Sequence, residues 1–192
     1  MPDIPWSAGR WSNPPAAVET AGDGALHVTA VEGSDAWRLT SYGFVHDSEH
    51  ALLAPFAEGS AVEVEFTAAF SAQFDQAGVF IRVSPEHWVK AGVEYADGTA
   101  QVGAVVTDGR SDWSLAPVPD WLGRRVLVRA SRRGDAVTIR AGVDGDLRLV
   151  RVLPLAPDLA AEAGPMICAP TSAELTIDFH AWRATEGDIA LH

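Results

Sequence analysis

Apolar and polar residues alternate with a period of two along most of this chain, which is the pattern of half-buried β-strands. Clusters of Gly, Pro, Asp and Ser separate these segments, as turns require. Strands are therefore predicted at Ala25–Val31, Asp35–Ser41, Ala61–Phe70, Gln76–Val83, Trp88–Tyr95, Thr99–Thr107, Arg124–Ser131, Ala136–Val143, Leu147–Leu153, Pro165–Ala169 and Glu174–Trp182. Only residues 157–163 have a composition that suits a turn or two of helix.

Many short strands at regular spacing, with no helices to cross between parallel strands, predict an all-β antiparallel sandwich of two sheets. The chain has 192 residues, which suits one domain at roughly 100–200 residues per domain. The Pro-rich stretches at 13–15 and 116–119 are too short to be linkers between domains. A single domain over residues 1–192 is expected.

The segment from Asp75 to Trp113 is the most informative part of the pattern. Its Asp97-Gly98 pair predicts a two-residue hairpin turn, because both central residues tolerate positive φ. That turn pairs Ala96 with Thr99 and places Glu94 beside Gln101. In the preceding strand, 76–83, the even-numbered residues face away from the core. This alternation favours a row of glycines, Gly78, Gly92 and Gly103, on the face that does not carry the apolar residues.

Two interpretations of the glycine row are open. It can be the floor of a ligand groove, since glycine in a strand often marks close approach by another molecule. It can equally let a strongly curved sheet bend, with Lys90 and Glu94 as ordinary solvated neighbours. Lys90 favours the groove, because it is the one lysine among 14 basic residues and a compact ammonium suggests a specific need.

A polar groove with aromatic side chains suits a saccharide, because sugar faces stack on rings while hydroxyl groups need donors and acceptors. Lys90 and Glu94 are expected to face outward and to be replaceable without leaving a cavity. Trp37, Trp121 and Trp182 are expected to serve packing. The predicted ligand-binding residues are Asp75, Gln76, Gly78, Trp88, Lys90, Gly92, Glu94, Gln101, Asp112 and Trp113.

Charge and composition exclude several classes of protein. The formal net charge is −12, which disfavours nucleic acid and anionic membrane surfaces as partners. No run of about 18 apolar residues offers a membrane span, and the N-terminus has no secretion-signal pattern. Cys168 is the single cysteine, so it has no partner for an internal disulfide. A cytoplasmic protein is expected.

Catalytic alternatives find less support. The strand with Lys90 and Glu94 has one acid and one amine, whereas glycosidases need two carboxylates. His46, Asp47, Glu49 and His50 offer possible metal ligands, although a surface loop is the favoured interpretation. Cys168 lies in an apolar run and is expected to be a buried, inert thiol. No catalytic residue, metal or cofactor is therefore predicted.

Several linked motifs, in order and at plausible spacing, resemble domain of unknown function family 1349, which includes the fungal regulation-of-enolase proteins. The motifs lie at 75–78, 88–94, 105–107 and 111–114, with further matches at 35–38, 143–145 and 168–170. Ala36 and Cys168-Ala169 depart modestly from the family pattern. The resemblance implies a concanavalin A-like lectin/glucanase fold, a jelly roll with one convex and one concave sheet.

The sequence thus predicts a lectin-like module that binds a saccharide or sugar-derived metabolite on its concave sheet. A protein-interaction or regulatory module of carbohydrate metabolism, using the same groove with a protein partner, is the alternative. A glycoside-active enzyme comes third. The identity of the ligand and the oligomeric state are left open.

Overall fold

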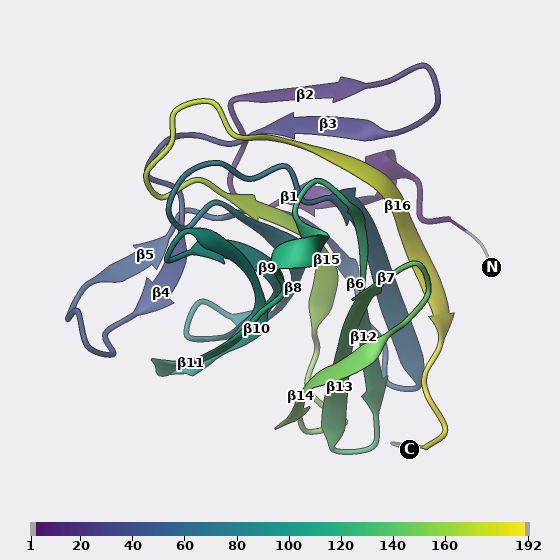
Figure 1. The fold of residues 1–192 in the computed structure, drawn as a ribbon. Coiled ribbons are helices and arrows are strands. Elements are labelled where there is room, and N and C mark those ends of the chain that lie inside the picture. The colour runs from purple at the N-terminus through teal and green to yellow at the C-terminus, as the bar shows by residue number, and fades with distance from the viewer. Residues whose placement is uncertain (1–2, 191–192) are drawn as a thin grey trace.

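The computed structural model describes residues 3–190 as a sandwich of two seven-stranded antiparallel sheets (Figure 1). The first sheet, here called the pocket sheet, has the order β1-β6-β15-β8-β9-β10-β11. Its strands are Arg10–Trp11 (β1), His50–Pro55 (β6), Glu162–Cys168 (β15), Gln76–Ser84 (β8), His87–Ala96 (β9), Thr99–Asp108 (β10) and Arg110–Pro117 (β11). The predicted all-β sandwich is confirmed.

The second sheet has the order β14-β13-β12-β7-β16-β3-β2. Its strands are Arg148–Pro154 (β14), Ala136–Val143 (β13), Arg125–Arg133 (β12), Ser60–Thr67 (β7), Thr176–Glu186 (β16), Leu26–Thr29 (β3) and Ala17–Thr20 (β2). A separate pair, Ala36–Arg38 (β4) and Val45–Asp47 (β5), lies apart from both large sheets beside β8 to β10 (Figure 1). Two short 3₁₀ helices, Trp6–Ala8 (η1) and Pro119–Trp121 (η2), complete the described elements.

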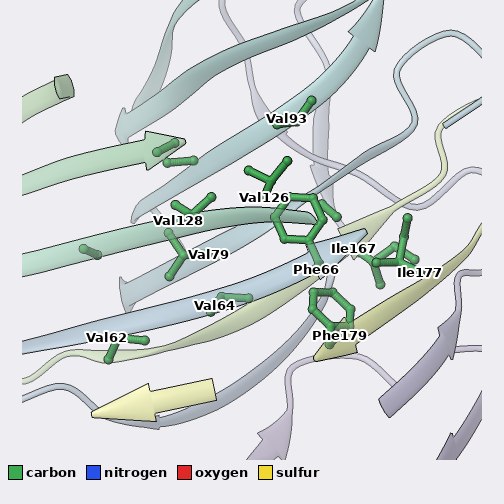
Figure 2. Close-up of a cluster of buried hydrophobic side chains, with 14 of the residues drawn as sticks. Val62, Val64, Phe66, Val79, Val93, Val126, Val128, Ile167, Ile177 and Phe179 are labelled. Carbon is green, nitrogen blue, oxygen red and sulfur yellow. The ribbon is translucent and has the colours of Figure 1, made fainter. Parts of the chain in front are cut away.

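The core lies between the two sheets and consists of the inward residues that the alternation predicted. Figure 2 shows valines and phenylalanines of β7, β12 and β16 meeting Val79 of β8 and Val93 of β9. These side chains are almost completely buried. Burial of apolar area at about 25 cal/mol per Å² is the main favourable term that holds the sheets together.

The predicted register is confirmed along the centre of the pocket sheet. Ala96 pairs with Thr99 across the Asp97-Gly98 turn, where both residues have positive φ. Gly103 lies beside Gly92, and Gly92 lies beside Gly78.

Close approach of the neighbouring strands accounts for the glycine row. A Cβ atom on Gly92 would lie 2.1 Å from the carbonyl oxygen of Ala77, and one on Gly78 would lie 2.1 Å from that of Ala91. Both obstacles are backbone of the neighbouring strand, so glycine is required there whether or not a ligand binds. Of the two interpretations of this row, the structure favours curvature.

The other face of the pocket sheet is not an open groove. A second apolar cluster fills part of it, beneath the β4–β5 pair, with members Ala36, Trp37, Ala51, Leu53, Phe80, Trp88, Val105, Met166 and Cys168. The alternative that treats Lys90 and Glu94 as ordinary solvated residues is therefore wrong, because they are only 5% and 9% exposed.

Five strands were not predicted from the alternation: β1, β2, β5, β6 and β11. The burial of β6 shows why, since four successive residues from His50 to Leu53 are buried and leave no period of two. Residues 157–163 form a turn and then the start of β15 instead of a helix. Within residues 3–190, no helix is long and apolar enough to cross a membrane.

Candidate functional site

A pocket of about 360 Å³ opens between the β4–β5 pair and the face of β8 to β10 that points away from the main core. Its polar floor comes from Gln76 on β8 and from Lys90 and Glu94 on β9. Its walls come from the segment 33–46 and from Trp113 on β11.

A tight loop turns the segment between β4 and β5 back over the sheet. Leu39, Ser41 and Gly43 all have positive φ, and the Leu39 amide donates to the Phe44 carbonyl oxygen at 2.8 Å. Trp37 anchors the base of this loop, because its ring is buried in the second cluster and its Nε1 donates to the carbonyl oxygen of Thr40 at 3.0 Å.

The pocket walls are a chain of aromatic rings in mutual contact. Trp37 meets Trp113 edge-on, with 6.1 Å between ring centroids, and meets Tyr42 at 5.7 Å. Tyr42 stacks on Phe44 at 5.3 Å, and Phe44 meets His46 edge-on. Trp37 was expected to serve packing alone, and the structure places it also in the pocket wall.

Lys90 is paired within the protein. Its Nζ donates to Oδ1 of Asp35 at 2.7 Å. Burial pushes the pKa of Lys90 down, but the nearby carboxylates, Asp35 foremost, more than offset this and hold the pKa above its ordinary value. Lys90 is therefore a charged ammonium whose partner comes from the loop before β4.

Glu94 has no such partner. Its Oε1 is buried without a hydrogen bond among the described residues. Burial raises the pKa of Glu94 to about 7, while Lys90 lowers it and Asp35 raises it by smaller amounts. At neutral pH this carboxyl group is therefore present in both its neutral and its charged form.

The predicted site residues divide into two sets. The pocket brings together Gln76, Lys90, Glu94 and Trp113, and Gly92 lines only a narrow adjoining space of about 20 Å³. The residues that do not line the pocket are Asp75, Gly78, Trp88, Gln101 and Asp112.

Structural roles account for four of these outlying residues. Trp88 is buried and stacks on Phe80, and Asp75 accepts hydrogen bonds from the Ser71 and Ala72 amides. Gln101 donates to the backbone of Ala96. Asp112 lies opposite the inward residue Val106 and pairs with Arg151 of the second sheet, so it points away from the pocket.

Sequence reasoning missed Asp35, Tyr42, Phe44 and His46, and missed the pocket role of Trp37. One usable signal existed: three aromatic residues and a histidine fall within ten positions, in a chain with 8% aromatic residues. The pairing of Asp35 with Lys90, 55 positions apart, has no local signal.

The segment 46–50, which was expected to be a surface loop, lies mostly within strands. His46 belongs to β5 and His50 to β6. His50 is buried, and its Nε2 accepts a hydrogen bond from the Val31 amide at 3.0 Å. Residues 3–190 contain no group of three or more His, Cys, Asp or Glu side chains placed to hold a metal ion.

Cys168 is buried in the second cluster, 3.5 Å from the sulfur of Met166. Burial raises the pKa of its thiol well above the ordinary value. A neutral buried thiol is a poor nucleophile, as the sequence predicted.

Comparison with known proteins identifies the family. Residues 11–187 match the family described as "Protein of unknown function (DUF1349)". The chain belongs to this family. It is 34% identical to Regulation of enolase protein 1 of Saccharomyces cerevisiae over 181 residues, which cover 93% of this chain and 90% of the yeast protein.

Solved structures agree with the fold. A functionally unknown protein from Saccharomyces cerevisiae superposes with a TM-score of 0.88 at 32% identity, covering 95% of this chain and 98% of that one. The carbohydrate-binding module CBM66 from Bacillus subtilis gives a TM-score of 0.59 at 14% identity, with 93% and 96% covered. A xylan beta-1,4-xylosidase from Bacillus halodurans gives 0.70 at 15% identity, with 97% of this chain and 39% of the enzyme covered. At such identities the last two show the fold alone.

Proposed function

We propose that this member of the DUF1349 family is a lectin-like module that binds a saccharide or sugar-derived metabolite in the pocket between the β4–β5 pair and β8 to β10. The observation that carries the proposal is the combination of aromatic walls with a polar floor that holds an unpartnered carboxyl group. A volume of about 360 Å³ falls within the range of small-molecule sites.

Each part of the pocket suits a sugar. The ring of Trp113, which is 38% exposed, offers an apolar surface for the C–H side of a pyranose, and the buried Trp37 ring beside it extends the apolar wall. The amide of Gln76 and the carboxyl of Glu94 supply donors and acceptors for hydroxyl groups. The fold is shared with a carbohydrate-binding module, and this analogy supports the same use.

Binding is a better proposal than hydrolysis. Of the two carboxylates that line the pocket, Asp35 is held by the Lys90 ammonium, and Glu94 alone is unpaired. A glycosidase needs one acid to protonate the leaving group and another to act on the opposite side of the bond. A carboxylate committed to an ion pair is poorly suited to either task.

One observation favours a protein-interaction module as the second candidate. Tyr42, Phe44 and Val45 at the rim are 58%, 43% and 44% exposed, and exposed apolar groups in one place often mark a binding surface. A relative carries the name Regulation of enolase protein 1.

The cytoplasmic location stays a prediction. One buried free cysteine is compatible with a reducing compartment.

Thermal-shift screening against mono- and oligosaccharides and sugar phosphates tests the proposal. A ligand that binds only the folded state raises the melting temperature, so at least one saccharide is expected to do so. Trp113→Ala is expected to remove that shift, because it deletes one wall of the pocket. Leu122→Ala, an exposed apolar side chain outside the pocket, is the matched control and is expected to retain it. An absence of any shift, or a shift that survives in Trp113→Ala, contradicts the proposal.

A further inference from the structure

We propose that the pocket recognises a ligand that carries a positive charge, a protonated or methylated amine, which the Glu94 carboxylate and the surrounding aromatic rings hold together. This inference rests on the proposed binding function and names the chemistry of its ligand. For a saccharide, the corresponding class is an amino sugar.

The charges of the pocket support this choice. Lys90 and Asp35 form an ion pair with 2.7 Å between Nζ and Oδ1. Neither residue therefore needs an opposite charge on the ligand. Glu94 is about nine-tenths buried, lines the pocket, and has an oxygen with no partner among the described residues. An unpartnered buried carboxylate is costly, and a cation is the partner that compensates it best.

The walls point to the same ligand. Trp37, Tyr42, Phe44 and Trp113 all line this pocket. The plane of Trp37 lies at 66° to that of Tyr42 and at 86° to that of Trp113, while Tyr42 and Phe44 are stacked at 10°. Faces and edges of several rings around one space form an aromatic cage, and such cages bind ammonium groups by cation–π attraction. The chain's net charge of −12 adds long-range attraction for a cation.

The affinity of the pocket for a cation is expected to depend on pH, because Glu94 gains and loses a proton. Burial raises the pKa of this carboxyl to about 7, so binding of a cation must displace a proton when the pH is below that value. The other charged or titratable groups nearby are the paired Lys90 and Asp35, His46 in the pocket wall, and Cys168 beneath it. Affinity for a permanent cation is expected to rise about tenfold from about pH 6 to about pH 8.

Calorimetric titration with four probes tests the inference. Choline keeps its charge at every pH, and 3,3-dimethylbutan-1-ol is its uncharged isostere; glucosamine and glucose form a second matched pair. Choline is expected to bind at least about tenfold more tightly than its isostere at about pH 8. Glucosamine is expected to bind more tightly than glucose at about pH 7, where most of its amine is protonated. Glu94→Gln is expected to abolish both preferences and the pH dependence, while Glu19→Gln, at an exposed position on β2 outside the pocket, retains them.

The outcomes separate this inference from the proposed function. If glucose and glucosamine bind equally and choline does not bind, the ammonium inference is wrong and saccharide binding stands. Binding of choline without either sugar supports ammonium recognition, and the saccharide screen with Trp113→Ala then decides the proposed function. If none of the four probes binds, the inference fails, and the saccharide screen with Trp113→Ala decides the proposed function separately. Choline affinity that is unchanged in Glu94→Gln also overturns the inference.

Discussion

Gly92→Ala is expected to destabilise the protein by about 3 kcal/mol or more. The added Cβ would lie 2.1 Å from the Ala77 carbonyl oxygen and 2.7 Å from the Cα of Gly78. Both atoms belong to the backbone of β8, the neighbouring strand in the middle of the sheet, so neither can move without opening the β8–β9 ladder. Urea unfolding followed by circular dichroism measures the loss.

Gly22→Ala is the matched control for this change. A Cβ at Gly22 meets nothing within 4 Å, so its effect is expected to be within about 0.5 kcal/mol of zero. If Gly92→Ala proves as stable as Gly22→Ala, curvature is not the reason for glycine at position 92, and the groove-floor interpretation returns.

Glu94→Gln is expected to make the protein more stable than the wild type at about pH 8 and equally stable at about pH 4.5. The folded-state pKa of Glu94 is about 7, against an ordinary value of 4.5, so the folded state holds a proton that the unfolded chain has already released. The stability from this group is fully present below pH 4.5 and is lost as the pH rises towards 7. The neutral amide of glutamine resembles the protonated acid and avoids that loss.

The expected advantage of Glu94→Gln at about pH 8 is about 3 kcal/mol. Urea unfolding at several pH values measures it. Glu19→Gln, at an exposed position on β2, is the control and is expected to show no comparable pH-dependent difference. A constant difference between wild type and Glu94→Gln from about pH 4.5 to 8 would mean that the carboxyl group is solvated, which contradicts the description of the pocket.

The sequence predicted the sandwich and the register of β8, β9 and β10 because both depend on local rules. Alternation assigned each residue to a face, and the Asp97-Gly98 turn set the pairing of Glu94 with Gln101. Those rules also placed Gln76, Lys90 and Glu94 on one face, where the structure has them.

The environment of that face could not be predicted in the same way. Whether Lys90 is solvated or buried depends on how the segment 35–47 folds over it, and that contact joins residues far apart in the chain. Trp88 illustrates the limit, because alternation places it beside Lys90 on the same face, yet it stacks on Phe80 in the second cluster and does not reach the pocket. The alternation of residues shows which face of the sheet a side chain lies on, but not which other segments cover that face.

The central claim is that the space between the β4–β5 pair and β8 to β10 is a ligand site, and the indole N–H resonances of the tryptophans test it most directly. Spectra of ¹⁵N-labelled protein are recorded before and after addition of each saccharide of the screening panel, with Trp37→Phe and Trp113→Phe used to assign the two pocket signals. The account predicts that at least one saccharide moves the Trp37 and Trp113 signals and leaves those of Trp121 and Trp182, which lie outside the pocket, in place. Movement confined to tryptophans outside the pocket, or no movement with any saccharide, would contradict it.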